Sequence, residues 1–170
     1  MRIELENAKE PGRRFSQNFE AGELAFEESD LRLVEPVNVA GQIRRKSGEV
    51  EIGGELHTKV ALPCARCLKE VELPIDVKFA ERFVASVSWR NDEHHELSKD
   101  DLDLGLVDEA IELNDLVKEE ILLALPGHLL CNESCKGICA ICGIDRNSSD
   151  CKCESRQVDA RWEKLKDLRF

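Results

Sequence analysis

The eight cysteines of this 170-residue chain are the side chains best suited to metal chemistry. Six of them fall within the last forty residues, in the pattern Cys131-x3-Cys135-x3-Cys139-x2-Cys142-x8-Cys151-x-Cys153. Two cysteines separated by two residues allow one tight turn to direct two thiolates at one ion, about 2.3 Å away. Cys139 and Cys142 have this spacing, and Gly143 after them suits a turn in which a Cβ would be crowded. The C-terminal cysteines therefore predict a structural zinc site.

Six cysteines exceed the four that one zinc ion needs. Cys139 and Cys142 would be completed either by Cys151 with Cys153 or by Cys135 with one of its neighbours. The preferred ligands are Cys135, Cys139, Cys142 and Cys151, with Cys131 and Cys153 as further candidates. A polar loop at residues 145–150 precedes Cys151, as expected of a chain that returns to a metal. Because every such ligand set is all sulfur and leaves no open position for water, the site is expected to be structural rather than catalytic.

Clustered cysteines also form disulfides or hold iron–sulfur clusters. A disulfide framework needs an oxidising compartment, but the chain opens Met1-Arg2-Ile3-Glu4-Leu5-Glu6, with no apolar run typical of a signal peptide. An iron–sulfur cluster would use the same thiolates, since ligand type alone does not separate soft metals. Zinc is the preferred interpretation.

Cys64 and Cys67 form a second pair with this spacing, far upstream. Four interpretations stay open: a redox pair, half of a metal site completed by another protomer, ligands of the C-terminal zinc, or a tight structural turn. A redox pair with a lowered thiol pKa belongs at a helix N-terminus near positive charge. This pair follows a predicted strand instead, although Arg66 and Lys69 are close in sequence, so the redox interpretation is disfavoured.

Length and composition indicate a real hydrophobic core, since 42% of the 170 residues are hydrophobic. We expect a main domain at residues 1–127 and a cysteine-rich zinc module with a basic helix at residues 128–170. No stretch approaches the roughly 18 apolar residues of a membrane span, so a soluble, cytoplasmic protein is expected.

Acidic residues concentrate in one segment of the chain. Residues 92–120 contain twelve carboxylates and two lysines, which accounts for most of the net charge of −11. Such a run is typical of a solvated loop and an outer helix face. It would also suit a docking surface for a basic partner, attracted over a distance that salt would shorten.

The middle of the chain has the alternation of β-strands. Residues 37–45 alternate apolar and polar side chains, Lys46-Ser47-Gly48 is typical of a turn, and residues 50–52 resume the pattern. Two more strands are expected at 56–62 and 71–79, joined by a tight turn at 64–68. The predicted fold class is α+β: an antiparallel meander, open or closed into a barrel, with a few helices and a small C-terminal zinc-binding module. Residues 11–30 are ambiguous.

The clearest predicted helix covers residues 115–125, with Asn114 as N-cap and Pro126-Gly127 as its stop. One face of it carries Val117, Ile121, Ala124 and Leu125. A second, basic helix is expected near the C-terminus, with an apolar stripe of Trp162, Leu165 and Leu168. The adjacent His94 and His95 lie in a polar stretch and are expected to be solvated.

Several motifs together resemble the YceD family of large ribosomal RNA accumulation proteins. They are Cys64-x-Arg66-Cys67-Leu68, Ile111-Glu112-Leu113, the run from Glu120 to Pro126, Cys135-Lys136-Gly137-Ile138-Cys139-x2-Cys142-Gly143 and Cys151-x-Cys153. The resemblance runs from about residue 34 to the C-terminus, and the order and spacing of the motifs carry it. It implies a role in the synthesis, processing or stable accumulation of large-subunit ribosomal RNA, and hence in assembly of the large ribosomal subunit.

The residues themselves favour a non-enzymatic factor. The sequence contains no Gly-rich phosphate loop and no recognisable Ser-His-Asp arrangement among its four histidines. Precursor RNA would be contacted through the basic residues Arg44, Arg45, Lys46, Lys59, Arg66 and Lys69. With no tyrosine and 5% aromatic residues, base stacking is disfavoured and phosphate contacts would dominate.

A ribosomal protein is the favoured partner, because the acidic segment would attract a basic protein and the net charge repels RNA. Two alternatives from other classes remain. One is a zinc-ribbon adaptor in transcription or protein quality control, and the other is a thiol–disulfide redox protein that uses Cys64 and Cys67.

Overall fold

The computed structural model describes residues 2–4, 12–26, 30–46, 49–86, 104–108 and 110–153 of the chain. The predicted C-terminal helix and the His94-His95 pair lie outside these residues. The described elements are β1 Arg2–Glu4, β2 Arg13–Phe19, β3 Arg32–Leu33, β4 Val37–Lys46, β5 Glu49–Pro63, β6 Glu70–Ala85, β7 Leu104–Val107, β8 Ala110–Glu112 and α2 Leu113–Leu123.

Six strands form one curved sheet in the order β2-β4-β5-β6-β7, with β3 paired to β5 outside this path. The predicted antiparallel meander is confirmed, because β4, β5 and β6 are neighbours both along the chain and across the sheet. The last pair, β6 and β7, is parallel. Among the described strands, β2 and β7 form opposite edges and do not pair with each other, so the expected alternative of a closed barrel is wrong.

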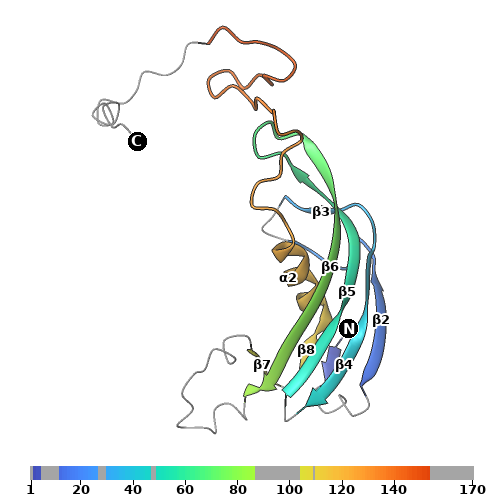
Figure 1. Ribbon diagram of the computed structural model, residues 1–170. Helices are drawn as coiled ribbons and strands as arrows, with labels where there is room; N and C mark the ends of the chain where they lie inside the picture. The colour runs from blue at the N-terminus through green and yellow to red at the C-terminus, as the bar shows by residue number, and fades with distance from the viewer. Residues whose placement is uncertain are drawn as a thin grey trace, which may run out of the picture.

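The alternation in β5 places its apolar side chains on one face of the sheet. Leu56 and Val60 are fully buried there, while Glu55 and His57 are exposed on the other face. The helix α2 covers this apolar face on the concave side of the sheet (Figure 1). Burial of apolar surface between the sheet and α2 is therefore the main source of stability for the described part of the chain.

The predicted helix at 115–125 is present, but its bounds and its cap differ from the prediction. It covers Leu113–Leu123, and its N-cap is Glu112, which makes no side-chain capping bond, rather than Asn114. The helix starts earlier because β8 runs directly into it and places Leu113 in the core with no exposed surface. Leu125 packs against the core as expected, whereas Ala124 is exposed.

The ambiguous segment at 11–30 contains a strand that the sequence did not predict. β2 pairs with β4 along its whole length, from Arg13 opposite Ile43 to Phe19 opposite Val37. Phe15 packs against the core and Phe19 is buried in it, but the other side chains of the strand are polar or charged. Residues 13–19 form a strand because they pair with β4, and the alternation of their own side chains was too weak to predict a strand.

The turn between β5 and β6 lies at one end of the elongated sheet, and the chain after α2 leads to the same end (Figure 1). Residues 128–153 continue beyond this turn, mostly as turns and bends. The fold therefore brings the upstream cysteine pair and the C-terminal cysteines together.

No helix in the described part of the chain has the length and apolar character that a membrane crossing needs.

Candidate metal centres

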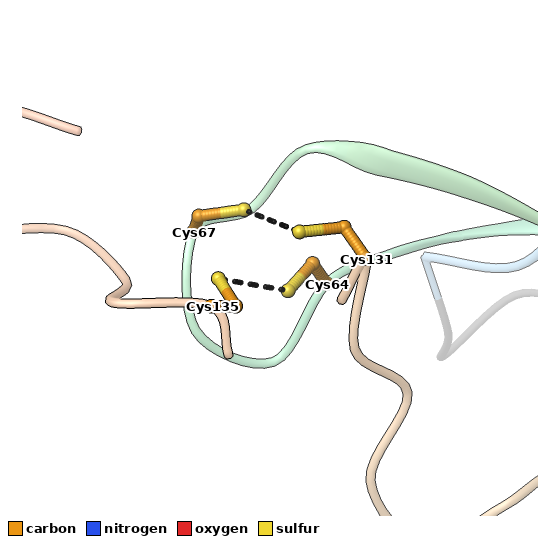
Figure 2. A group of neighbouring side chains, drawn as sticks. All are labelled: Cys64, Cys67, Cys131 and Cys135. Carbon is orange, nitrogen blue, oxygen red and sulfur yellow. Dashed lines mark hydrogen bonds between the residues drawn. The ribbon is translucent and has the colours of Figure 1, made fainter. Parts of the chain in front are cut away.

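Four cysteines meet at the tip of the β5–β6 hairpin, and we call them the proximal cluster: Cys64, Cys67, Cys131 and Cys135. Figure 2 shows two of them on the turn between the strands and two on the segment that follows α2. All four sulfur atoms lie within 4.8 Å of one another. Cys64 is completely buried, and Cys135 is 3% exposed. The hairpin turn contributes half of this group, and the segment at residues 128–153, which we call the tail, contributes the other half.

The sulfur–sulfur distances in the proximal cluster match a tetrahedral metal site. The Sγ atoms of Cys64 and Cys135 lie 3.9 Å apart, and those of Cys67 and Cys131 lie 3.5 Å apart. A tetrahedron with metal–sulfur bonds of about 2.3 Å has edges of about 3.8 Å, whereas a disulfide bond is about 2.05 Å long. The observed spacing therefore fits one ion bound at the centre of four thiolates.

The remaining four cysteines form the distal cluster: Cys139, Cys142, Cys151 and Cys153. Their sulfur atoms also lie within 4.8 Å of one another, but all four residues belong to the tail. Cys139 is 8% exposed, whereas Cys142 and Cys153 are exposed. The distal cluster is thus a more open group with the same set of ligand atoms.

The turn at Cys64 has the backbone geometry of a metal knuckle. The N–H of Arg66 points at the Cys64 sulfur, with a nitrogen–sulfur distance of 3.5 Å. The N–H of Leu68 donates to the Cys64 carbonyl at 3.0 Å and closes the turn. Leu68 has a φ of 61°, in the left-handed region that a leucine rarely adopts.

The turn at Cys139 repeats this geometry. The N–H of Ile141 lies 3.5 Å from the Cys139 sulfur, and the N–H of Gly143 donates to the Cys139 carbonyl at 2.8 Å. Gly143 has a φ of 73° and corresponds to Leu68 in the first turn. Two segments that are far apart in the sequence therefore build the same ligand-presenting turn.

Backbone N–H groups within each turn make the first thiol of that turn more acidic. The pKa of Cys64 is lowered to about 6, chiefly by the backbone N–H of the second cysteine in its pair, and the pKa of Cys139 is lowered to about 6 in the same way. In contrast, the pKa values of Cys131 and Cys153 are raised to about 12, chiefly because each thiol hydrogen-bonds to a neighbouring cysteine sulfur. A divalent cation bound in either cluster would replace these shared protons.

Backbone hydrogen bonds join the tail to the hairpin turn beside the proximal cluster. The N–H of Ala65 donates to the Leu129 carbonyl at 2.8 Å, and the N–H of Ile138 donates to the Arg66 carbonyl at 3.0 Å. The Arg66 guanidinium donates to the Cys135 carbonyl at 2.9 Å. The tail thus lies against the turn through hydrogen bonds that a metal between them would reinforce.

The structure groups the predicted zinc ligands differently from the sequence analysis. It keeps Cys139, Cys142 and Cys151 together and adds Cys153, but it places Cys135 in the other cluster. Cys135 lies there with Cys131 and the upstream pair because the tail crosses the hairpin turn between residues 129 and 138. A usable sequence signal was the repeat of Cys-Ala-x-Cys at both turns, together with a total of eight cysteines, enough for two four-ligand sites.

Comparison with known proteins identifies the family. The sequence profile described as "Large ribosomal RNA subunit accumulation protein YceD" matches residues 52–169, which include all eight cysteines. The chain belongs to the YceD family. No solved structure matches it.

Relatives of this YceD-family chain occur in bacteria and in plants. The uncharacterized protein YlbN of Bacillus subtilis is 32% identical over 156 residues, covering 91% of this chain and 86% of YlbN. The maize chloroplast protein named "Large ribosomal RNA subunit accumulation protein YCED homolog 1" is 25% identical over 72% of this chain. This chain spans 50% of that maize protein's length. An uncharacterized protein of Mycobacterium tuberculosis is 28% identical over 75% of this chain and 59% of its own length.

The basic residues proposed for partner contacts lie at two ends of the YceD-family sheet, except for Lys59, which lies within β5 and pairs with Glu35 at 2.6 Å. Arg44 and Arg45 are exposed near the end of β4, whereas Arg66 and Lys69 flank the turn after β5. Because β5 has 15 residues, these sets are separated by roughly 45 Å of strand. Lys46 is the last residue of β4, and its side chain is not among those that the structure describes.

A shallow depression of about 930 Å³ lies on the sheet face opposite α2, across β2, β4, β5 and β6. Small residues, including Ala40, Gly53 and Ala80, leave room at its centre. Its charged lining residues are Arg14, Arg44, Lys78 and Glu55. Arg44 also pairs with Glu51 at 2.7 Å. The lining is therefore moderately basic, in contrast to the net charge of −11 of the whole chain.

Proposed function

We propose that this protein is a non-enzymatic factor that supports accumulation of large-subunit ribosomal RNA during assembly of the large ribosomal subunit. The observation that carries the proposal is the family match over residues 52–169, reinforced by the name of the maize relative. The role would be exerted through a ribosomal protein or the precursor RNA.

Zinc is the proposed cofactor, with a structural role. Both clusters consist of four cysteine sulfurs, a ligand set that suits zinc and leaves no open position for a substrate or an activated water. The sulfurs lie closer together than an iron–sulfur cluster, which holds several iron atoms, would place them. The burial of Cys64 and Cys67 also suits metal ligands better than redox thiols, which need solvent access.

The basic depression supports contact with the phosphate groups of a precursor. Arg14 on β2 and Lys78 on β6 are exposed on opposite sides of its lining, with β4 and β5 between them. Phosphate contacts position a protein on RNA without base stacking. The acidic segment supports contact with a basic ribosomal protein, and Glu112, Asp115 and Glu119 are its exposed described members on β8 and α2. Both surfaces can act on the same assembly intermediate.

The test is deletion of the gene in its native host, with the ratio of large- to small-subunit ribosomal RNA as the readout. We expect the ratio to fall and incomplete large subunits to accumulate in sucrose gradients. The intact gene should restore both. An unchanged ratio together with normal gradients would overturn the proposal and would favour the adaptor or redox alternatives.

A pair of charge reversals on β2 tests the depression. Arg14→Glu should weaken co-sedimentation with large-subunit precursors, because Arg14 lines the depression. Arg13→Glu is the matched control, since Arg13 is its exposed neighbour on the same strand and does not line the depression. Equal effects of the two variants would assign any loss to net charge rather than to this surface.

A further inference from the structure

The two CxxC turns match each other in every feature that presents a metal ligand. Each has the sequence Cys-Ala-x-Cys, and each has an N–H at 3.5 Å from its first sulfur. Each is closed by an N–H donated to the carbonyl of its first cysteine and ends in a left-handed residue. Each turn also faces two further cysteines that complete a group of four. The chain thus contains two complete ligand sets and no cysteine outside them.

We propose that the protein binds two zinc ions, one in each cluster, and that the two ions have different structural tasks. The proximal ion joins the tail to the β5–β6 turn, whereas the distal ion closes the tail on itself. This inference rests on the proposed structural zinc, but it does not depend on the ribosomal role.

The proximal site has the geometry of a clamp between distant segments. Its contacts join Cys67 to Cys131 and Cys64 to Cys135, residues that are 64 and 71 positions apart. Outside the metal site, the described contacts at this junction are a few hydrogen bonds, including those from Ala65 and Ile138, and the packing of Leu130 and Val71 against the cysteines. Closing so long a loop costs conformational entropy, and bonds to a metal offset this cost.

The distal site has the geometry of a local module. Its four ligands lie within 15 consecutive residues, from Cys139 to Cys153, and none comes from the sheet. The N–H of Cys139 donates to the Ile144 carbonyl at 2.8 Å, and Ile138 forms a β-bridge with Asp145. These bonds shape a compact loop around the sulfurs. Because two distal cysteines are exposed, a chelator should reach this ion first.

A short connection links the two sites and keeps them distinct. Cys135 is the last proximal ligand and Cys139 is the first distal ligand. Between them, Ile138 donates to the Arg66 carbonyl, and the N–H of Arg146 donates to the Gly137 carbonyl at 2.9 Å. The connection therefore contacts the proximal turn on one side and the distal loop on the other. Because the sites share no cysteine, either site can release its ion while the other keeps all four of its ligands.

The experiment is native mass spectrometry of the full chain purified without chelator, with elemental analysis to identify the metal. The wild type should carry two zinc ions. Cys64→Ser/Cys67→Ser and Cys151→Ser/Cys153→Ser should each carry one. The matched controls Ala65→Ser and Ala140→Ser add a hydroxyl group at an exposed position inside each turn and should keep two.

Hydrogen exchange distinguishes the two tasks. The proximal double variant should lose protection at the Ala65 and Ile138 amides, which bond across the junction between the turn and the tail. The distal double variant should keep protection at Ala65 and lose it at Cys139. If a variant fails to fold, titration of the metal-free wild type with Co²⁺ gives the same count, with two equivalents required to saturate the absorbance of thiolate-bound cobalt.

One zinc ion per wild-type chain would overturn the two-site inference and leave the structural zinc in place. No zinc at all would overturn both the two-site inference and the proposed structural zinc. Two iron atoms in place of zinc would do the same. Loss of both ions from either double variant would contradict the independence of the sites. The ribosomal RNA ratio in the deletion strain is measured separately, so failure of the proposed role would leave the metal count untouched.

Discussion

At the residue scale, three left-handed backbone positions mark the metal-binding end of the molecule. Leu68 and Gly143 follow the two CxxC turns, and Gly137 lies on the connection between the clusters. Glycine adopts this conformation without penalty, whereas a residue with a Cβ is strained there by about 1–2 kcal/mol. The leucine at position 68 therefore carries strain that glycine avoids at the equivalent position 143.

Replacing Leu68 with glycine should stabilise the zinc-loaded protein. The Leu68 side chain is 63% exposed, so its removal costs little packing, while relief of the left-handed strain exceeds the added freedom of the unfolded chain by about 0.5 kcal/mol. Leu68→Ala is the control, because it removes the same exposed side chain and keeps the strain. The measurement is urea unfolding of both variants. A glycine variant no more stable than the alanine variant would contradict the strain argument.

Replacing Gly137 with alanine should destabilise the junction between the sheet and the tail. Gly137 has a φ of 71°, and a Cβ at this position would lie 2.9 Å from the Arg66 carbonyl oxygen. That oxygen accepts the bond from the Ile138 N–H, so the clash falls on a contact that joins the two segments. We expect a loss of about 1–2 kcal/mol and faster exchange of the Ile138 amide.

Gly127→Ala provides the matched control for this prediction. No atom lies within 4 Å of the Cβ position at Gly127, and its φ is outside the left-handed region. The control should change the unfolding free energy by less than about 0.5 kcal/mol. If both variants lose the same stability, the effect at position 137 does not come from the contact with Arg66.

At the element scale, the sequence predicted the structures whose signal is local. Alternation in residues 37–45 and 71–79 predicted β4 and β6, and the apolar period in residues 115–125 predicted α2. The edge strand β2 was missed because its pairing with β4 supplies the stabilisation that its own polar residues do not show. Whether the meander closes depends on how the two edge strands lie in space, which alternation does not encode.

The helix α2 also carries a buried carboxylate that should make stability depend on pH. Burial raises the pKa of Glu120 above its ordinary value, and the charges of Glu81 and Glu119 raise it further. Because the pKa is higher in the folded state, the folded state favours the protonated acid. The stabilisation from this proton is present below the unfolded pKa and is lost as the pH rises through the folded pKa.

Replacing Glu120 with glutamine should therefore raise the melting temperature more at about pH 7 than at about pH 4. Glutamine keeps the shape of the protonated acid and carries no charge at either pH. Glu119→Gln, an exposed neighbour on the same helix, should show a smaller difference between the two pH values. Thermal unfolding by circular dichroism measures both. An equal gain for Glu120→Gln at both pH values would show that the carboxylate charge is not the cause.

At the scale of the whole molecule, the pairing of the cysteine clusters is the property least accessible from the sequence. Spacing connected Cys139 with Cys142, and the structure places both in the distal cluster, because their proximity is local. It did not show that Cys135 meets Cys64, which lies 71 positions earlier. That contact exists because the chain after α2 passes the β5–β6 turn at the end of the sheet (Figure 1). Long-range ligand sets follow from the path of the chain rather than from local periodicity.

Metal removal should separate the molecule into a stable part and a loosened part. The sheet and α2 share one hydrophobic core, whereas Cys64, Cys67 and Cys135 belong to a separate small cluster with Val71 and Leu130. A strong zinc chelator should therefore leave the β5 and β6 amides protected. The amides of residues 128–153 should exchange quickly, because turns and bends provide few other hydrogen bonds.

Hydrogen exchange with mass spectrometry checks this outcome, and readdition of metal supplies the control. Zn²⁺ should restore protection in the tail, whereas Mg²⁺, which prefers oxygen ligands, should not. Unfolding of the whole sheet after chelation would show that the proximal site also stabilises the core. Unchanged exchange in the tail would show that the hydrogen bonds at Ala65 and Ile138 suffice without metal. The predicted result lies between these limits, because the metal stabilises the junction and burial against α2 stabilises the sheet.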